Sequence, residues 1–217
     1  MSDRTKVKIC GIRDSEAAIA AADAGADFIG LNFVDGVKRQ ITLDEAKKIL
    51  TEYRSIPAGP DGPKIVGLFR NQPIEFVNEV VAELGLDYVQ LNGDEDDNYD
   101  AQMTVPIFHQ VRVQAGFSPE SVSDLVNGHV EKSRGVVLDA FDPSTPGGSG
   151  KTFEWSIAEQ VASEEGVLIA GGLNPENVVK AVQQLTPWGV DVASGVESDG
   201  VKDPELIRQF VRAAKNA

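Results

Sequence analysis

Two residues that could transfer protons lie at the ends of predicted β-strands. Cys10 ends the strand predicted over residues 6–10, and Asp139 ends the one predicted over residues 135–139. A thiol and a carboxyl group ordinarily have pKa values of about 8.5 and about 3.9, and surroundings that shift both toward neutrality would let them act as base and acid across one cavity. Taken singly, a lone cysteine is more often a small buried apolar side chain, and such an aspartate is more often a cap. As a pair, they suit proton transfer on a sugar phosphate.

Glycine-rich segments follow the last two predicted strands. Gly171 and Gly172 come after one of them, and Ser194 and Gly195 come after the other. Backbone N–H groups at such positions can point at an anion near the N-terminus of a helix. One glycine pair is commonly a simple turn, but two pairs after neighbouring strands predict a phosphate-binding site.

Short β-branched runs alternate along the chain with longer segments whose apolar residues recur every three or four positions. This alternation is typical of a parallel sheet built from βα units. The predicted strands cover residues 6–10, 28–32, 64–69, 88–91, 107–111, 135–139, 167–170 and 190–193. Eight units of about 27 residues predict a single (β/α)8 barrel domain, a TIM barrel, over residues 1–217, with its functional groups at the C-terminal ends of the strands. An open, doubly wound sheet is the alternative, but phosphate binding after the seventh and eighth strands favours the barrel.

Three predicted helices carry start signals. Asp14 precedes the first helix, and Thr42 precedes the second with Glu45 at the capping-box position. Pro175, which follows Asn174, stands where the first residue of the helix after the seventh strand is expected.

The composition excludes several classes of partner. The 34 acidic residues against 20 basic residues give a net charge of −14, which repels nucleic acid and anionic membranes. The sequence has no apolar run near the roughly 20 residues that span a bilayer, and no apolar signal segment at its start. We therefore expect a cytoplasmic protein with no nucleic-acid and no membrane partner.

Metal binding is not expected either. One cysteine cannot form an internal disulfide, and Cys10 with His109 and His129 makes no spaced zinc set. The acidic run 94–97, with Asp100, could suggest a cation site, but a solvated helix start with carboxylates near the positive end of the helix dipole is favoured. The two histidines are interpreted as strand and surface residues and not as catalysts.

A glycine-rich loop follows the sixth predicted strand. Residues 145–152 (TPGGSGKT) are similar to the phosphate loop of nucleotide triphosphatases, but Thr145 stands where that motif requires its first glycine, and the connection is longer than the motif uses. We predict instead that Gly147, Gly148 and Gly150 belong to a mobile loop over the site, which closes on substrate and excludes water.

Many short motifs occur in a fixed order from end to end of the chain. They are KICGI from residue 8, GLNF from 30 with Arg39 following, VGLF from 66, VQL from 89, LD from 138, GGSGKTF from 147, AGGL from 170, DVASGVE from 191 and KD from 202. In this number and order they are highly specific, and the chain resembles the phosphoribosylanthranilate isomerases of tryptophan biosynthesis.

The resemblance implies the Amadori rearrangement of N-(5-phosphoribosyl)anthranilate to 1-(2-carboxyphenylamino)-1-deoxyribulose 5-phosphate, without metal or organic cofactor. Asp139 would be the general acid that opens the sugar ring, and Cys10, as thiolate, would remove the proton from C2. Arg39 would pair with the anthranilate carboxylate, a task that suits its fork of donors. Asp191 would lie near the sugar hydroxyls.

The amides at Gly171, Gly172, Ser194 and Gly195 would hold the phosphate. The partner implied is therefore a small sugar phosphate, and the resemblance leaves monomer and homodimer open.

The sequence departs from the family pattern at two places. Asn92 follows Gln90-Leu91 where a histidine is usual, and it keeps hydrogen-bonding capacity but does not titrate near neutrality. Gln90 and Asn92 are therefore substrate-binding candidates whose contribution depends on this change. Val37 replaces a common serine two residues before Arg39.

Two other functions are weighed against the isomerase. A barrel lyase or synthase acting on an anthranilate or indole sugar phosphate would need a catalytic lysine at a strand end, whereas Lys6 and Lys8 lie within the first strand. A non-catalytic sugar-phosphate binder would bind ligand without converting it, and Asn92 is the feature that favours it.

Overall fold

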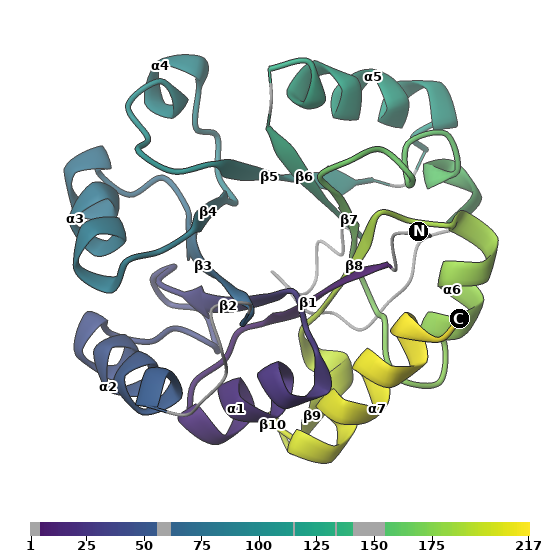
Figure 1. Cartoon of the computed structure of the whole chain (residues 1–217). Coiled ribbons are helices and arrows are strands. Elements are labelled where there is room, and N and C mark those ends of the chain that lie inside the picture. The colour runs from purple at the N-terminus through teal and green to yellow at the C-terminus, as the bar shows by residue number, and fades with distance from the viewer. Residues whose placement is uncertain (1–4, 56–61, 115, 133, 141–154) are drawn as a thin grey trace.

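Eight parallel strands close into a barrel in the order in which they occur along the chain, because β1 pairs with β8 as well as with β2. The computed structural model describes residues 5–55, 62–114, 116–132, 134–140 and 155–217. Figure 1 looks along the barrel, with the helices arranged around its outside. The strands are β1 (Lys6–Cys10), β2 (Phe28–Asn32), β3 (Lys64–Phe69), β4 (Tyr88–Leu91), β5 (Ile107–Val113), β6 (Gly135–Ala140), β7 (Val167–Ile169) and β8 (Gly189–Val192). The predicted barrel is confirmed, and the open-sheet alternative is wrong.

The helices that cover the barrel differ in length. They are α1 (Ser15–Ala24), α2 (Leu43–Ser55), α3 (Ile74–Leu84), α4 (Asp97–Asp100), α5 (Pro119–Val130), α6 (Val178–Leu185) and α7 (Pro204–Lys215). Two 3-10 helices, η1 (Trp155–Ala158) and η2 (Ser194–Val196), precede β7 and follow β8. A small antiparallel hairpin of β9 (Glu197–Ser198) and β10 (Val201–Lys202) lies between η2 and α7. The fourth predicted unit is thus built around a helix of only four residues.

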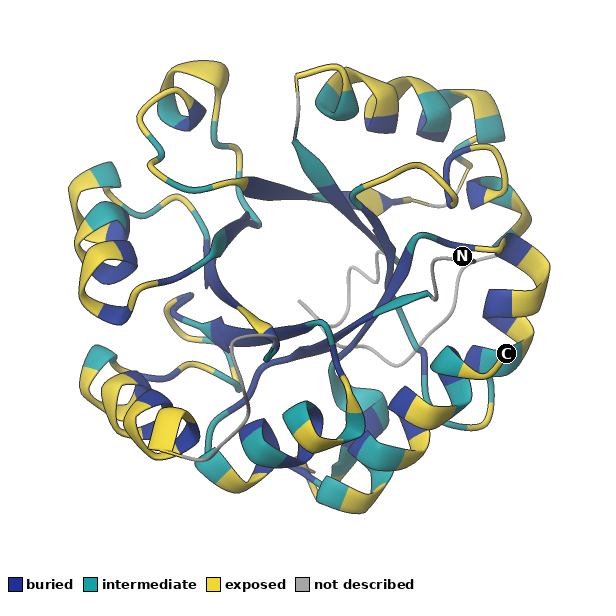
Figure 2. Ribbon diagram, viewed as in Figure 1, coloured by how far each residue is buried: buried dark blue, intermediate teal, exposed yellow. Residues whose placement is uncertain are grey.

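The buried side chains form a layer between the strands and the helices and a second cluster inside the barrel. Figure 2 shows the strands and the inward faces of the helices as buried, and the outward faces of the helices as exposed. Inside the barrel, Phe28 packs edge-on against Tyr88 and Phe108 with ring centroids 5.6 and 5.8 Å apart. These aromatic residues occupy the N-terminal half of their strands. Polar side chains that point into the barrel nearer the C-terminal ends therefore lie above an apolar floor.

Two of the predicted helix starts are confirmed. The Asp14 side chain accepts a hydrogen bond from the backbone N–H of Ala17, 2.8 Å away. Thr42 and Glu45 bond each other reciprocally through side chain and backbone, as a capping box requires.

The predicted start of the helix after β7 is wrong. Helix α6 begins at Val178, with Asn177 as its N-cap residue, and not at Pro175. The Asn174 side chain accepts hydrogen bonds from the backbone N–H groups of Glu176 and Asn177, so it stabilises a separate turn before the helix.

The acidic run before α4 is used in caps and ion pairs. The Asp96 side chain caps α4 by accepting from the N–H of Tyr99, and exposed Asp97 pairs with Lys132 and Arg134. These residues agree with the interpretation of a solvated helix start. Asp100 does not, because it is buried and bonds His109.

Candidate active site

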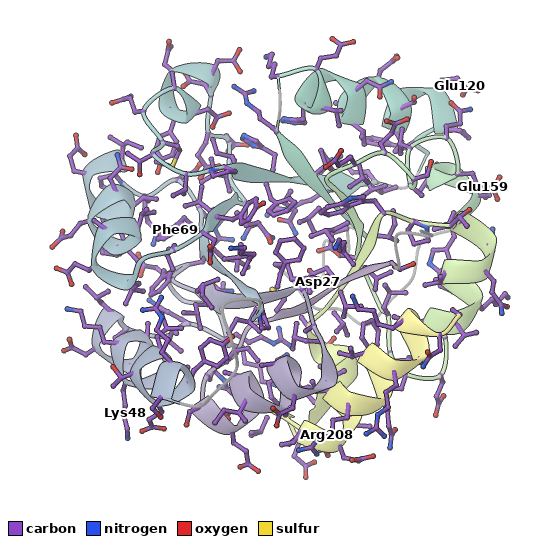
Figure 3. All side chains as sticks on the ribbon, viewed as in Figure 1. Asp27, Lys48, Phe69, Glu120, Glu159 and Arg208 are labelled. Atoms are coloured by element: carbon purple, nitrogen blue, oxygen red, sulfur yellow. The ribbon has the colours of Figure 1, made fainter. Side chains whose placement is uncertain are left out.

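The strands direct a set of polar side chains into the barrel. Side chains alternate between the two faces of a strand, so residues two apart point the same way. Cys10 belongs to the cluster inside the barrel, and so does Val137, which places Asp139 on the inward face of β6. Figure 3 shows side chains projecting toward the barrel centre from the strands. Five polar residues point inward from β1, β4, β5, β6 and β8. They are Cys10, Gln90, Gln110, Asp139 and Asp191.

Cys10 ends β1 in a crowded, nearly closed position. Its exposed fraction is 7%, and the neighbouring strand packs closely against it, since a Cβ on Gly30 would lie 3.3 Å from Cα of Cys10. Gly11, which follows Cys10, has φ +76°, and a Cβ on it would lie 2.5 Å from Cδ of Arg39. Glycine adopts this left-handed backbone conformation without strain, and its lack of a Cβ lets the Arg39 side chain lie across the end of β1.

The thiol is surrounded by opposing electrostatic influences. Burial raises the pKa of Cys10, whereas the Lys8 and Lys202 ammonium groups lower it; Asp191 raises it further, and the net direction is upward. A buried thiol without cations nearby would hold its proton more firmly, so the two lysines bear directly on formation of the thiolate.

Asp139 is positioned by a glutamine from the neighbouring strand. Nε2 of Gln110 donates a hydrogen bond to a carboxylate oxygen of Asp139 at 2.9 Å, and Nε of Arg112 lies 3.3 Å from Oε1 of Gln110. Sequence reasoning missed Gln110 and Arg112. The alternation of β5 carried the signal, because Phe108, Gln110 and Arg112 share the inward face.

Lys8 and Asp191 form a buried ion pair inside the barrel. Nζ of Lys8 lies 2.9 Å from Oδ1 of Asp191, and the two residues are paired in register between β1 and β8. Burial alone would lower the pKa of Lys8, but Asp191 and Cys10 outweigh burial and raise it. Asp191, predicted to lie near the sugar hydroxyls, is therefore also the counter-ion of a lysine.

Arg39 is held by a carboxylate that sequence reasoning did not single out. Its Nε and Nη2 donate to the two carboxylate oxygens of Glu197 at 2.5 and 2.9 Å, and Lys202 donates to Glu197 and to the Ala193 carbonyl at 2.9 and 2.6 Å. Burial would raise the pKa of Glu197, but Arg39 and Lys202 lower it to about 2. Both Glu197 and Lys202 stand within motifs of the chain's last segment, which was the available signal.

The two glycine segments predicted to bind phosphate lie against each other. Gly171 and Gly172 follow β7 with φ values of 88° and 64°, and Gly195 lies in η2 directly after β8. A Cβ on Gly195 would be 1.8 Å from the carbonyl oxygen of Leu173, so only glycine allows the two loops to approach this closely. The prediction that both segments serve one site is therefore compatible with their positions.

The remaining predicted site residues are Gln90 and Asn92 at the end of β4 and the three glycines of the predicted loop. Nε2 of Gln90 donates to Oδ1 of Asn92 at 2.9 Å, so the residue that replaces the usual histidine is oriented by its neighbour on β4. The glycines predicted to form a loop over the site, Gly147, Gly148 and Gly150, lie outside the described residues.

The described ranges contain no group of three or more His, Cys, Asp or Glu side chains that could hold a metal ion. Within the same ranges, every helix is too short or too polar to cross a membrane.

A closed barrel of βα units, with a thiol and a carboxyl group facing inward at strand ends and glycine loops after β7 and β8, has the architecture of a (β/α)8-barrel enzyme that acts on a phosphorylated substrate. Residues 7–213 match the family model described as N-(5'phosphoribosyl)anthranilate (PRA) isomerase. The chain belongs to this family, and it is an isomerase of tryptophan biosynthesis.

Individual relatives agree with this assignment. The N-(5'-phosphoribosyl)anthranilate isomerase of Dehalococcoides mccartyi is 39% identical over 215 residues, which cover 98% of this chain and 96% of the relative. The crystal structure of the Thermotoga maritima phosphoribosyl anthranilate isomerase is 33% identical, with a TM-score of 0.84 over 98% of this chain and 100% of that one. Another phosphoribosyl anthranilate isomerase structure, in complex with reduced 1-(o-carboxyphenylamino)-1-deoxyribulose 5-phosphate, is 30% identical with a TM-score of 0.79, over 98% of this chain and 100% of that one.

Proposed function

We propose that Asp139 and Cys10 are the general acid and the general base of the rearrangement of N-(5-phosphoribosyl)anthranilate. The observation that carries the proposal is the placement of a thiol and a carboxyl group on inward faces of β1 and β6, at the end where barrels place their reactive groups. The thiol lies near cations, and the carboxyl group is oriented by Gln110.

The proposed reaction has two proton transfers. Protonated Asp139 gives its proton to the ring oxygen as the C1–O bond breaks, which opens the ring to an iminium between C1 and the anthranilate nitrogen. The iminium makes the proton on C2 acidic, and the Cys10 thiolate removes it to give an enolamine. The enolamine then tautomerises to the ketone, with protonation at C1 and loss of the hydroxyl proton at C2. The iminium itself withdraws the electrons, so the scheme uses no cofactor.

Substrate binding is proposed to use the groups around this pair. The bonds of Arg39 to Glu197 use Nε and Nη2, so we assign the Nη1 edge of the guanidinium to the anthranilate carboxylate. The backbone amides of Gly171, Gly172, Ser194 and Gly195 would bind the phosphate, and Gln90, Asn92 and Asp191 would face the sugar and the aryl group.

The first experiment generates phosphoribosylanthranilate in situ and follows the loss of its fluorescence with purified protein, without added metal. Cys10→Ala and Asp139→Asn are each expected to lower kcat by at least about 100-fold, the range that general acid–base groups contribute. Ser123→Ala, on the outward helix α5, serves as a variant expected to keep full activity. Turnover that survives in either site variant contradicts the assignment of that residue. Saturable binding of the reduced product without turnover in the wild type would instead indicate a sugar-phosphate binder and direct attention to Asn92.

We further propose that residues 1–217 form one domain that works in the cytoplasm on this small molecule as a monomer or homodimer. Light scattering across a protein concentration series measures the assembly state, and a mass that corresponds to neither state contradicts this part of the proposal.

A further inference from the structure

A lysine with no exposed surface lies on the same face of β1 as Cys10, two residues before it. Lys8 is 0% exposed, whereas almost all lysines of folded proteins keep the ammonium group in water. Its Nζ donates to Oδ1 of Asp191 at 2.9 Å, which satisfies the charge by an ion pair across the β1–β8 register. The barrel interior thus holds a fixed positive charge close to the position of the thiol.

Stability is a weak reason for such a pair. Taking two charges out of water costs as much as their attraction gains, and packed apolar side chains of similar volume often stabilise a protein equally well. The neighbouring strands show this alternative, because Phe28, Val66 and Leu168 fill comparable inward positions with apolar groups. The charge at Lys8 is therefore better explained by the chemistry of the group beside it.

That group is Cys10. The Lys8 ammonium favours the thiolate of Cys10, and Cys10 in turn favours the charged form of Lys8, so each group acts on the protonation of the other. Lys202 also favours the thiolate, while Asp191 opposes it, and Arg39 interacts electrostatically with the thiol from the segment after β2. Among these groups, Lys8 exerts the largest charge effect on Cys10.

We infer that Lys8, fixed by Asp191, is a positioning residue that supplies the positive charge beside which the Cys10 thiolate forms. The inference rests on the proposed role of Cys10 as the base. Asp191 consequently has two opposed effects: it holds the lysine in place, and its own negative charge disfavours the thiolate.

The thiol can be titrated directly because the chain contains one cysteine. The ultraviolet absorbance of the thiolate is recorded against pH, with the Cys10→Ser variant subtracted to remove the tyrosine contribution. The paired variant Lys8→Met/Asp191→Asn removes both charges and so avoids leaving a buried carboxylate unpaired. An opposite charge nearby shifts a pKa by about 1 to 3 units, and the loss of Asp191 offsets part of the loss of Lys8, so at a pH below the midpoint the thiolate fraction should fall by up to about tenfold.

Two single variants make the test specific. Asp191→Asn keeps the Oδ1 acceptor that holds Nζ of Lys8 and removes only the opposing negative charge, so its thiolate fraction should rise, which is the opposite direction to the paired variant. Lys6→Met is the matched control, since Lys6 lies on the same strand but is partly exposed and paired with Asp27 at 3.3 Å. It should leave the thiol titration unchanged. General loosening of the barrel would not give opposite signs in the first two variants.

The inference is overturned if the folded paired variant titrates like the wild type, or if Asp191→Asn moves the thiol in the same direction as the paired variant. If the paired variant does not fold, an NMR titration of the wild type tests the inference instead. The ¹³Cε resonance of Lys8 is expected to shift as Cys10 loses its proton. A resonance that does not respond overturns the inference. These measurements need no substrate. Persistent turnover by Cys10→Ala would therefore contradict the proposed function and leave the Lys8 effect intact.

Discussion

At the scale of single residues, the site is arranged so that carboxylates hold cations in place. Glu197 accepts both hydrogen bonds from one edge of Arg39 and a third from Lys202. Hydrogen bonds to charged groups contribute about 1.5–3 kcal/mol each, and such bidentate geometry restricts the guanidinium to one orientation. Arg39 is thus oriented before any substrate arrives, which lowers the entropy cost of binding a carboxylate.

Glu197→Gln should therefore weaken substrate binding more than it slows the chemical step. A glutamine side chain has one acceptor oxygen and cannot accept from both Nε and Nη2 as the two carboxylate oxygens do, so Arg39 should lose its fixed orientation and KM should rise about tenfold, the equivalent of about 1.4 kcal/mol. We expect kcat to change by less than KM. Steady-state kinetics measure both.

The matched control is Glu205→Gln on α7, where the carboxylate is mostly exposed and lies 3.6 Å from Arg208. This variant should keep the wild-type KM, because an exposed pair contributes little. If Glu197→Gln also keeps the wild-type KM, Glu197 does not orient Arg39 for binding.

At the scale of elements, the loops after β7 and β8 depend on one close approach. A Cβ at Gly195 would lie 1.8 Å from a backbone oxygen of Leu173, so Gly195→Ala must separate the two loops. A displacement of about 1 Å in a binding group can cost up to about 100-fold in rate, and we expect kcat/KM to fall at least tenfold. Inhibition by inorganic phosphate should weaken in parallel.

Gly128→Ala in α5 is the comparison for this variant, because no atom lies within 4 Å of a Cβ built there. Alanine has the higher helix propensity, so this change should leave kcat/KM unchanged and raise the free energy of unfolding by up to about 1 kcal/mol. Wild-type kinetics in Gly195→Ala would show that the close approach of the two loops does not matter for phosphate binding.

The sequence predicted the elements well because their limits depend on local chemistry. Gly11 follows the first strand, and Asp27, Pro63 and Asp87 precede the next three, and the structure places all four strands at the predicted residues. Strand β5 extends to Val113 because it pairs with β6 as far as Ala140, which no local signal shows. The predicted start of α6 is wrong because the Asn174 side chain accepts from the backbone N–H groups of Glu176 and Asn177 and so stabilises a turn that includes Pro175.

At the scale of the whole molecule, the pairs that define the site lie far apart in sequence. Lys8 pairs with Asp191 across 183 positions, and Arg39 pairs with Glu197 across 158. Local patterns can predict that Cys10 faces the mouth of the barrel, but barrel closure alone brings β1 beside β8. These long-range pairings could therefore not be predicted from local patterns, even where a motif or strand alternation pointed to the partner residue itself.

The acid stability of the molecule should depend on a histidine outside the site. His129, on α5, stacks on His109 with ring centroids 4.6 Å apart, and burial, with His109 and Arg134, lowers the pKa of His129 from 6.5 to about 4. The unfolded chain therefore binds this proton more readily between these values. The free energy of unfolding should fall as the pH drops from about 6.5 to about 4, and this contribution should level off below.

Glu197 contributes in a lower window, because its folded-state pKa of about 2 lies below its ordinary value of 4.5. Its stabilisation is present above about pH 4.5 and is lost as the pH falls toward 2. Urea unfolding at a series of pH values separates the two effects. His129→Gln should flatten the upper window and leave the lower one, whereas Asn127→Gln, a change without a titrating group on the same helix, should alter neither slope. An upper window that stays as steep in His129→Gln would mean that another group takes up the proton there.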